Sequence, residues 1–238
     1  MPSLLKQNPF FSVLLENGFC FFYMAKRIII TGATGMVGEG VLLTLLGQPD
    51  VEAVLSISRK PSGHTHPKLR ELLVADFFDL TAVEEELAGY TACFFCAGVS
   101  SLGMKEAAYT RVTHDLTLHF AQTLARLNPA MAFTYISGAG TGGRRQMWSR
   151  VKGRTETDLL ALPFRAAYMF RPGFLKPVPG QLHVLKMYRW IGWLFPLMRR
   201  FNWGSSLREL ALAMLHAAER GAPKQVLEVR DINLLAKS

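Results

Sequence analysis

The chain has 238 residues, of which half are hydrophobic and 19% are charged, so it can bury the core of one large domain and is not an intrinsically disordered protein. Its formal net charge of +9 would suit a nucleic acid, an anionic membrane surface or a phosphorylated small molecule. Because the Lys and Arg residues are spread along the chain, with one dense group at 144–154, we do not expect a nucleic-acid partner.

The first 23 residues differ in character from the rest of the chain. The stretch "NPFFSVLLENGFCFFYMA" is apolar, but Glu16 interrupts it and it falls short of the roughly 20 residues that a membrane span needs. It also lacks the basic start and the clear cleavage site of a signal peptide. "MAKRIIITG", from Met24, is a common opening for a domain. We therefore expect residues 1–23 to be an extension outside the fold and residues 24–238 to form one domain, with an N-terminal membrane anchor as the alternative.

Strand-like and helix-like segments alternate after this extension. Apolar, β-type runs predict strands at residues 27–31, 51–58, 70–77, 91–98, 131–140 and 165–173. The segments between them predict helices at residues 35–47, 81–89, 105–127 and 147–162. Continuous apolar strands separated by helices indicate a parallel sheet covered on both faces, and right-handed crossovers make it a doubly wound α/β fold.

The C-terminal part has a different pattern. Residues 182–201 are helix-like, aromatic and basic, with Trp190 and Trp193 among Lys and Arg residues. They predict either a lid helix packed on the substrate side of the sheet or an interfacial helix in peripheral contact with a membrane. A helix is expected at residues 205–221, and residues 224–232 can close the sheet as a last short strand.

The first predicted strand runs directly into "TGATGMVG". Gly32 can turn sharply off the strand, Gly35 can let the backbone approach a pyrophosphate, and Gly38 can let the helix pack on the strand. The pyrophosphate would then accept hydrogen bonds from free N–H groups at the helix N-terminus. We therefore expect a dinucleotide to be bound by Gly32, Thr34, Gly35, Met36, Val37 and Gly38.

The end of the second predicted strand bears on the choice of cofactor. A protein that binds unphosphorylated ribose places a carboxylate there, roughly 20 residues after the glycines. This chain has Arg59 and Lys60 at that place and no acid. Because cations suit a 2′-phosphate, we expect NADP in preference to NAD, with a basic surface turn as the alternative.

The cysteines and histidines give no metal site. Cys93 and Cys96 have the Cys-x-x-Cys spacing, but they lie in an apolar strand, where positions three apart face opposite sides. We interpret them as buried thiols of a reducing compartment. His64 and His66 lie in a Pro-flanked loop without evident metal partners.

Between about residues 25 and 236, the chain resembles the atypical short-chain dehydrogenases/reductases of the NAD(P)-binding epimerase/dehydratase-like group. "TGATGMVG" is similar to that group's glycine motif, and "VADFFD", "CAGVSS" and "RPG" resemble its later cofactor segments. The resemblance implies a Rossmann fold. It also implies cofactor contacts at Asp76 and Phe77 beside the adenine, at Ala97 and Gly98 along the cofactor, and at Arg171, Pro172 and Gly173 near the nicotinamide.

The same resemblance places the chemistry and exposes a gap in it. In that family a Ser ends the fifth strand and a Tyr-x-x-x-Lys follows on a helix; Ser137 and Lys152 match, but Trp148 takes the place of the tyrosine. In the family the Ser orients the substrate oxygen, the Tyr passes the proton, and the Lys holds the ribose. Trp cannot exchange a proton, and a general acid/base is worth ~10²–10⁴-fold in rate. Thr113 stands where the family often has an Asn.

Three interpretations of Trp148 stay open. Another hydroxyl, such as Tyr135 or Ser149, can replace the tyrosine; hydride can move without a protein proton donor; or the chain can be a nucleotide-sensing or partner-binding module with little chemistry. We expect an oxidoreductase acting on a small molecule. His114 and His119 are expected to serve packing or the surface. We expect a cytoplasmic protein, with peripheral membrane contact through residues 182–201 as an addition; neither substrate nor oligomeric state is evident from the sequence.

Overall fold

The computed structural model describes residues 11–16, 19–24, 26–143, 145–184 and 195–238. Its centre is a seven-stranded sheet of order β11-β8-β7-β6-β3-β4-β5, in which every neighbouring pair is parallel. The strands are β3 (Lys26–Thr31), β4 (Val51–Ser58), β5 (Leu69–Leu73), β6 (Ala92–Phe95), β7 (Ala132–Ile136), β8 (Ala166–Arg171) and β11 (Val226–Glu228). The predicted doubly wound Rossmann fold is confirmed, and its strand order reverses between β3 and β6.

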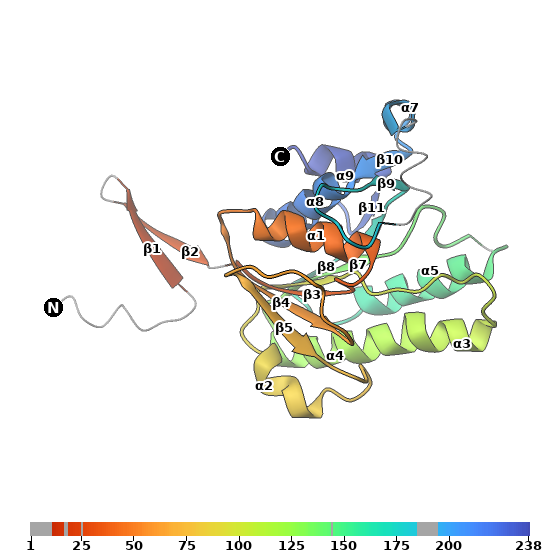
Figure 1. Cartoon of the computed structure of the whole chain (residues 1–238), viewed down its shortest axis with the longest axis horizontal. Helices are drawn as coiled ribbons and strands as arrows, with labels where there is room; N and C mark the ends of the chain where they lie inside the picture. The colour runs from red at the N-terminus through yellow and green to blue at the C-terminus, as the bar shows by residue number, and fades with distance from the viewer. Residues whose placement is uncertain (1–10, 17–18, 25, 144, 185–194) are drawn as a thin grey trace.

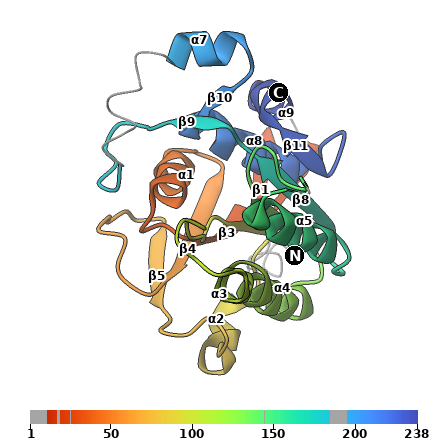
Figure 2. The same ribbon diagram turned by 90° about the vertical axis from the view of Figure 1, so that its right-hand side faces the viewer.

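Helices cover both faces of this sheet (Figures 1 and 2). One face carries α1 (Met36–Leu46), α8 (Leu207–Arg220) and α9 (Val229–Leu235), and the other carries α4 (Leu116–Leu127) and α5 (Met147–Leu160). Ile28 and Ile30 of β3 pack into the first core, whereas Ile29 packs into the second. Burial on both faces explains why these strands read as unbroken apolar runs.

The long helix predicted at residues 105–127 is interrupted. It consists of α3 (Glu106–Thr110), a π-helical turn (Arg111–Asp115) and α4. Within the π turn, His114 is buried and bonds through its two ring nitrogens to Asp115 and to Asp158 of α5, each at 2.7 Å. The turn thus fixes the position of α5, which gives His114 a packing role.

Two features of the C-terminal part were not evident from the sequence. Strand β9 (Phe174–Lys176) pairs in parallel with β10 (Gly204–Ser206), and the chain passes from β11 straight into α9. Of the helix predicted at residues 182–201, the structure has α7 (Phe195–Arg200), while Leu182 to Val184 are not helical. Residues 185–194, with Trp190 and Trp193, lie outside the described residues.

The N-terminal extension contains an antiparallel hairpin. Its strands are β1 (Phe11–Glu16) and β2 (Phe19–Met24), and Figure 1 shows the hairpin to one side of the sheet domain. Residues 1–10 lie outside the described residues. The smaller helix α2 (Glu84–Leu87) comes after β5, preceded by a 3-10 turn (Thr81–Val83). Across the described ranges, no helix has the length and apolar character needed to cross a membrane.

Candidate nucleotide-binding site

The glycine turn joins β3 to α1 in a fixed conformation. Gly32 has φ +75°, and the Gly35 N–H donates to the Gly32 carbonyl at 3.0 Å. Gly35 is the extended residue before α1, and its own carbonyl accepts from the N–H of Glu39 at 2.9 Å. A Cβ on Gly32 would lie 2.7 Å from the Ala97 nitrogen, so this turn needs glycine both for its φ and for the approach of β6.

The other two glycines of the motif have distinct roles. A Cβ on Gly38 would overlap the Gly32 carbonyl oxygen, so Gly38 serves the packing of the protein itself. Gly35 is exposed, and a Cβ there would meet nothing closer than the Gly32 oxygen at 3.5 Å. Among the residues that the structure describes, a Cβ on Gly98, after β6, or on Gly138, after β7, would meet nothing within 4 Å. The carboxyl ends of three adjacent strands are therefore open beside the α1 N-terminus, which fits the backbone cradle of a dinucleotide.

The predicted adenosine side is partly open. Arg59 and Lys60 are exposed directly after β4, and the Ser58 hydroxyl donates to the Lys60 carbonyl at 2.6 Å, which shapes that turn. Asp76 is exposed and accepts from the N–H of Phe78 at 2.9 Å. The Phe77 ring is buried and stacks on the ring of Phe120, so it serves the core.

Lys152 is a half-buried cation at the predicted chemical end of the site. It projects from α5, and its Nζ donates to the Ser137 carbonyl at 2.6 Å and to the Ile136 carbonyl at 3.5 Å. Burial disfavours its charged form and lowers its pKa to about 8, although Glu156 opposes this shift. Carbonyl dipoles therefore hold the ammonium at the end of β7, and the group can change charge near neutral pH.

Ser137 lies beside this lysine in a hydroxyl pair. Its Oγ is 2.8 Å from Thr141 Oγ1, and Thr141 Oγ1 also donates to the Gly138 carbonyl at 2.8 Å. Because the Thr141 proton is directed at that carbonyl, the Ser137 hydroxyl donates to Thr141. The structure thus brings together Ser137 and Lys152, the two residues that the sequence predicted for chemistry.

Neither hydroxyl considered as a substitute for the missing tyrosine is available. Ser149 Oγ donates to the Gly140 carbonyl at 2.6 Å and accepts from the Gly143 N–H at 2.7 Å, so it holds the loop before α5. Tyr135 is buried in the core, and burial raises its pKa far above the ordinary value. Trp148 is half-buried, and its ring lies beside the loop at Gly140.

The "RPG" segment has a structural role that the sequence did not reveal. Arg171 donates to both oxygens of Glu156, at 2.9 and 2.5 Å, and to Glu228 at 3.0 Å, and these carboxylates raise its pKa. Pro172 is buried, and a Cβ on Gly173 would overlap the Trp203 carbonyl oxygen. The Arg171 charge is thus compensated within the protein, and Gly173 lets the chain that leads into β10 approach.

The sequence reasoning missed Glu39, which organises the loops around α1. This buried carboxylate accepts from the N–H groups of Leu182 and His183, at 2.5 and 2.8 Å, and bonds to His64 Nε2 at 2.8 Å. Burial alone would raise the pKa of Glu39, but these hydrogen bonds outweigh it and lower the pKa. The only sequence signal was an acidic residue in the first turn of a helix.

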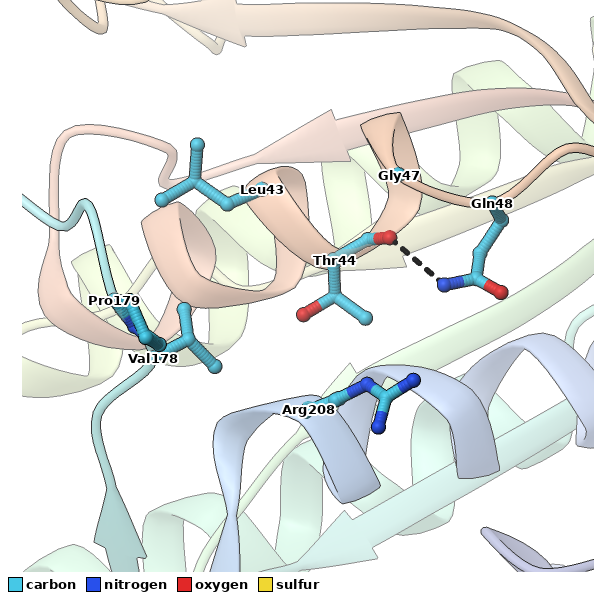
Figure 3. A pocket seen from close by; sticks show the side chains of 7 residues that line it. All are labelled: Leu43, Thr44, Gly47, Gln48, Val178, Pro179 and Arg208. Atoms are coloured by element: carbon cyan, nitrogen blue, oxygen red, sulfur yellow. Dashed lines mark hydrogen bonds between the residues drawn. The ribbon is translucent and has the colours of Figure 1, made fainter.

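A separate pocket of about 310 Å³ lies at the opposite end of α1 from the glycine turn (Figure 3). It is lined by Leu43, Thr44, Gly47, Gln48, Val178, Pro179 and Arg208, and none of them belongs to the predicted cofactor set. Among the described residues, no cluster of His, Cys, Asp and Glu can hold a metal ion. Cys93 and Cys96 are free thiols whose pKa values are raised by burial, which makes both poor nucleophiles.

The parallel sheet, the glycine turn at its switch point and the open strand ends define a nucleotide-binding protein of the Rossmann class. Residues 28–169 match the model of the NAD dependent epimerase/dehydratase family, and the chain belongs to that family. Among solved structures, it is similar to MoeE5 in complex with UDP-glucuronic acid and NAD, with a TM-score of 0.64, 16% identity and coverage of 85% of this chain and 76% of that one. It is also similar to WbmF of Bordetella bronchiseptica in complex with NAD+, with a TM-score of 0.63, 15% identity and coverage of 90% and 77%.

Curated relatives confirm the resemblance and correct one expectation. The chain is 30% identical over 234 residues to the protein FMP52, mitochondrial, of Chaetomium globosum, covering 90% of this chain and 98% of that protein. It is 28% identical over 153 residues to the protein HTATIP2 of Rattus norvegicus, covering 63% of each chain. Relatives from two Aspergillus species are also named mitochondrial. The expectation of a cytoplasmic protein is contradicted by these names, which point to mitochondria.

Proposed function

We propose that this protein is an NAD(P)-dependent oxidoreductase that interconverts a carbonyl and an alcohol on a small molecule. The observation that carries the proposal is the pairing of Ser137 and half-buried Lys152 at the carboxyl end of β7, beside open strand ends. A bound nicotinamide cofactor would supply or accept the hydride. The chain's own part is to bind that cofactor, orient the substrate oxygen and hold the proton.

The main chain of the glycine turn would bind the pyrophosphate. The N–H groups of the first turn of α1 lie directly after exposed Gly35, which has no side chain of its own to block an anion. The exposed cations Arg59 and Lys60 support NADP as the preferred form, because a guanidinium can bind a phosphate through two parallel hydrogen bonds. The family and the two similar structures are associated with NAD. A preference for NADP is therefore a proposal specific to this chain.

Lys152 would hold the proton as well as the ribose. Trp148 has no exchangeable acid, and both neighbouring hydroxyls are occupied or buried. Lys152 has a pKa of about 8, so its ammonium is present at neutral pH and its neutral amine is accessible just above. Ser137, whose carbonyl already accepts from that ammonium, would turn its hydroxyl proton from Thr141 to the substrate oxygen and so orient it. In reduction, the proton from Lys152 would pass to the product oxygen and be replaced from water.

The test combines cofactor binding with turnover. Titration with NADPH and with NADH should show binding of both and tighter binding of NADPH. Oxidation of bound NADPH by a panel of small aldehydes, ketones and quinones should then identify a substrate. Failure of both nucleotides to bind the folded protein would refute the proposal.

A second candidate is a nucleotide-sensing module, and Trp148 favours it because the ring removes the family's proton donor. That protein would bind the cofactor as tightly but stay inert toward every carbonyl in the panel. The mitochondrial names of the FMP52 relatives favour a mitochondrial location under either candidate.

A further inference from the structure

An exposed aromatic turn follows α7, far in sequence from the residues assigned to chemistry. The side chains of Leu197, Phe201 and Trp203 are 54%, 55% and 67% exposed, and the last two rings lie 5.6 Å apart. Single exposed apolar residues are common on soluble proteins, whereas three that are adjacent in space mark an interaction surface. We call Leu197, Arg200, Phe201 and Trp203 the aromatic turn.

The backbone holds this turn in one conformation. Asn202 has φ +55°, the left-handed conformation that ends many helices, and its N–H donates to the Arg199 carbonyl at 3.1 Å. The Trp203 N–H donates to the Met198 carbonyl at 2.8 Å, which completes a Schellman motif. The rings are therefore displayed by a closed helix end, so little conformational entropy is lost when they are buried against a partner.

The base of the turn is anchored in the domain. The Trp203 carbonyl accepts from the Phe174 N–H at 2.9 Å, where β9 and β10 begin to pair. Phe195, at the start of α7, is buried, and its ring lies 6.2 Å from that of Phe174. Figures 1 and 2 show α7 at the edge of the molecule. Phe195 thus anchors the turn in the domain, while the rings of Phe201 and Trp203 are exposed to solvent.

Two exposed cations lie at the aromatic turn or near its buried base. Arg200 is exposed in the last turn of α7, and exposed Lys176 lies with its Nζ 5.4 Å from the centroid of the Phe195 ring. Arg199 is paired with Glu209, so it holds α7 against α8 and adds little to the outer field. The whole chain carries a formal net charge of +9. A second copy would bring the same positive charge to the contact, whereas an anionic surface would complement it.

We propose that the aromatic turn docks the protein peripherally on an anionic lipid bilayer. Trp and Phe side chains suit the interfacial region, and Arg or Lys near the surface adds attraction to anionic headgroups. A lid over the substrate would bury these rings against the sheet, whereas they face solvent. The proposal is independent of the oxidoreductase function.

The experiment is flotation of the purified full-length protein with vesicles of phosphatidylcholine alone or mixed with phosphatidylglycerol. Wild-type protein should float with the mixed vesicles, bind the neutral ones much more weakly, and be released by high salt. Phe201→Ala/Trp203→Ala should reduce the partition coefficient by roughly tenfold or more, since each ring loses its buried apolar area. Leu73→Ala, which alters an exposed leucine on the far edge strand β5, should change nothing.

A second pair of variants isolates the charge. Arg200→Glu should weaken binding to the mixed vesicles more than Lys105→Glu, although both change net charge equally. If the double aromatic variant does not fold, Leu197→Glu provides the same test at a side chain exposed on α7. Equal binding by wild type and aromatic variants, or no binding by wild type, would overturn the proposal. A wild-type dimer that becomes monomeric in Phe201→Ala/Trp203→Ala would also overturn it and assign the surface to a second copy.

Discussion

The two ends of the nucleotide site are built in different ways. The glycine turn is contiguous in sequence, and its predicted ligand groups are main-chain N–H groups, which every residue except proline provides. The chemical end draws Ser137, Trp148 and Lys152 from two elements, and its action depends on side chains. The glycine turn also holds the fold at Gly32 and Gly38, so substitutions there should disturb folding, whereas a side-chain site can lose or alter its chemistry while the fold persists.

The largest effect is expected at Gly35, where the fold leaves space that the ligand needs. Gly35→Val should weaken the affinity for NADPH and for NADH by about 100-fold or more, because the side chain would occupy the pyrophosphate position. Calorimetric titration measures this loss. Gly47→Val, at the exposed other end of α1, is the matched control and should bind normally. A folded Gly35→Val protein with unchanged affinity would place the nucleotide elsewhere.

A variant at Gly38 tests the same assignment from the other side, because the Gly38 hydrogen that a side chain would replace faces the protein. Gly38→Val should fail to fold or unfold at much lower temperature, since the Gly32 carbonyl lies where its Cβ would be. Thermal unfolding followed by circular dichroism distinguishes the two variants. Equal stability of the Gly35 and Gly38 variants would contradict the separate roles given to them.

At the chemical end, the next largest effect is a gain. Trp148→Tyr should raise carbonyl reduction by ~10²–10⁴-fold if a carbonyl substrate lies between Ser137 and the nicotinamide. Trp148→Phe is the matched control, because it offers an aromatic ring without a hydroxyl and should give no gain. Single-turnover oxidation of bound NADPH measures both. A Tyr variant as inert as the Phe variant would favour the nucleotide-sensing module.

The pH dependence of turnover tests Lys152 directly. Because its pKa is lowered to about 8, its ammonium is lost as pH rises through that value, and reduction should slow by about tenfold per pH unit above it. Lys152→Arg should keep much of the cofactor binding but lose most of the turnover, because a guanidinium stays protonated and cannot give its proton to the product oxygen. Lys152→Ala should weaken both cofactor binding and turnover. Lys105→Ala, an exposed lysine, is the control. Wild-type turnover that survives Lys152→Ala undiminished would refute this active site.

The cofactor preference should respond by a smaller factor. Arg59→Ala/Lys60→Ala should weaken NADPH binding by roughly tenfold to 100-fold and leave NADH binding nearly unchanged, because only NADPH carries the 2′-phosphate. Competition titrations with both nucleotides give the ratio. Equal loss for both would indicate a general surface effect.

The smallest effect is expected on the folding stability that Glu39, in the first turn of α1, provides. Glu39→Gln should lower the free energy of unfolding by about 1–3 kcal/mol, because an amide cannot accept from all the donors that meet the carboxylate. Since the folded-state pKa of Glu39 is lowered, its contribution is present above its ordinary pKa and lost as pH falls through the lowered value. Urea unfolding at several pH values measures this, with exposed Glu52→Gln as control. A pH-independent difference between wild type and Glu39→Gln would contradict it.

The sequence by itself determined the sheet and the glycine turn between its first strand and first helix. Residues 51–58 form β4 with the predicted bounds, and the helix after Gly35 ends at Leu46, because apolar runs and glycines act over a few residues. Ser137 and Lys152 meet as expected, because one ends a strand and the other lies on the helix that comes after it.

Only the tertiary structure decided which of the polar residues are free to act. Arg171 is neutralised by Glu156 and Glu228, which lie 15 and 57 residues away, and the Tyr135 hydroxyl is lost to the core. Glu39 acquires donors more than 140 residues along the chain. Hydrogen bonds and burial depend on which segments meet in space, and no local pattern of residue types records those meetings.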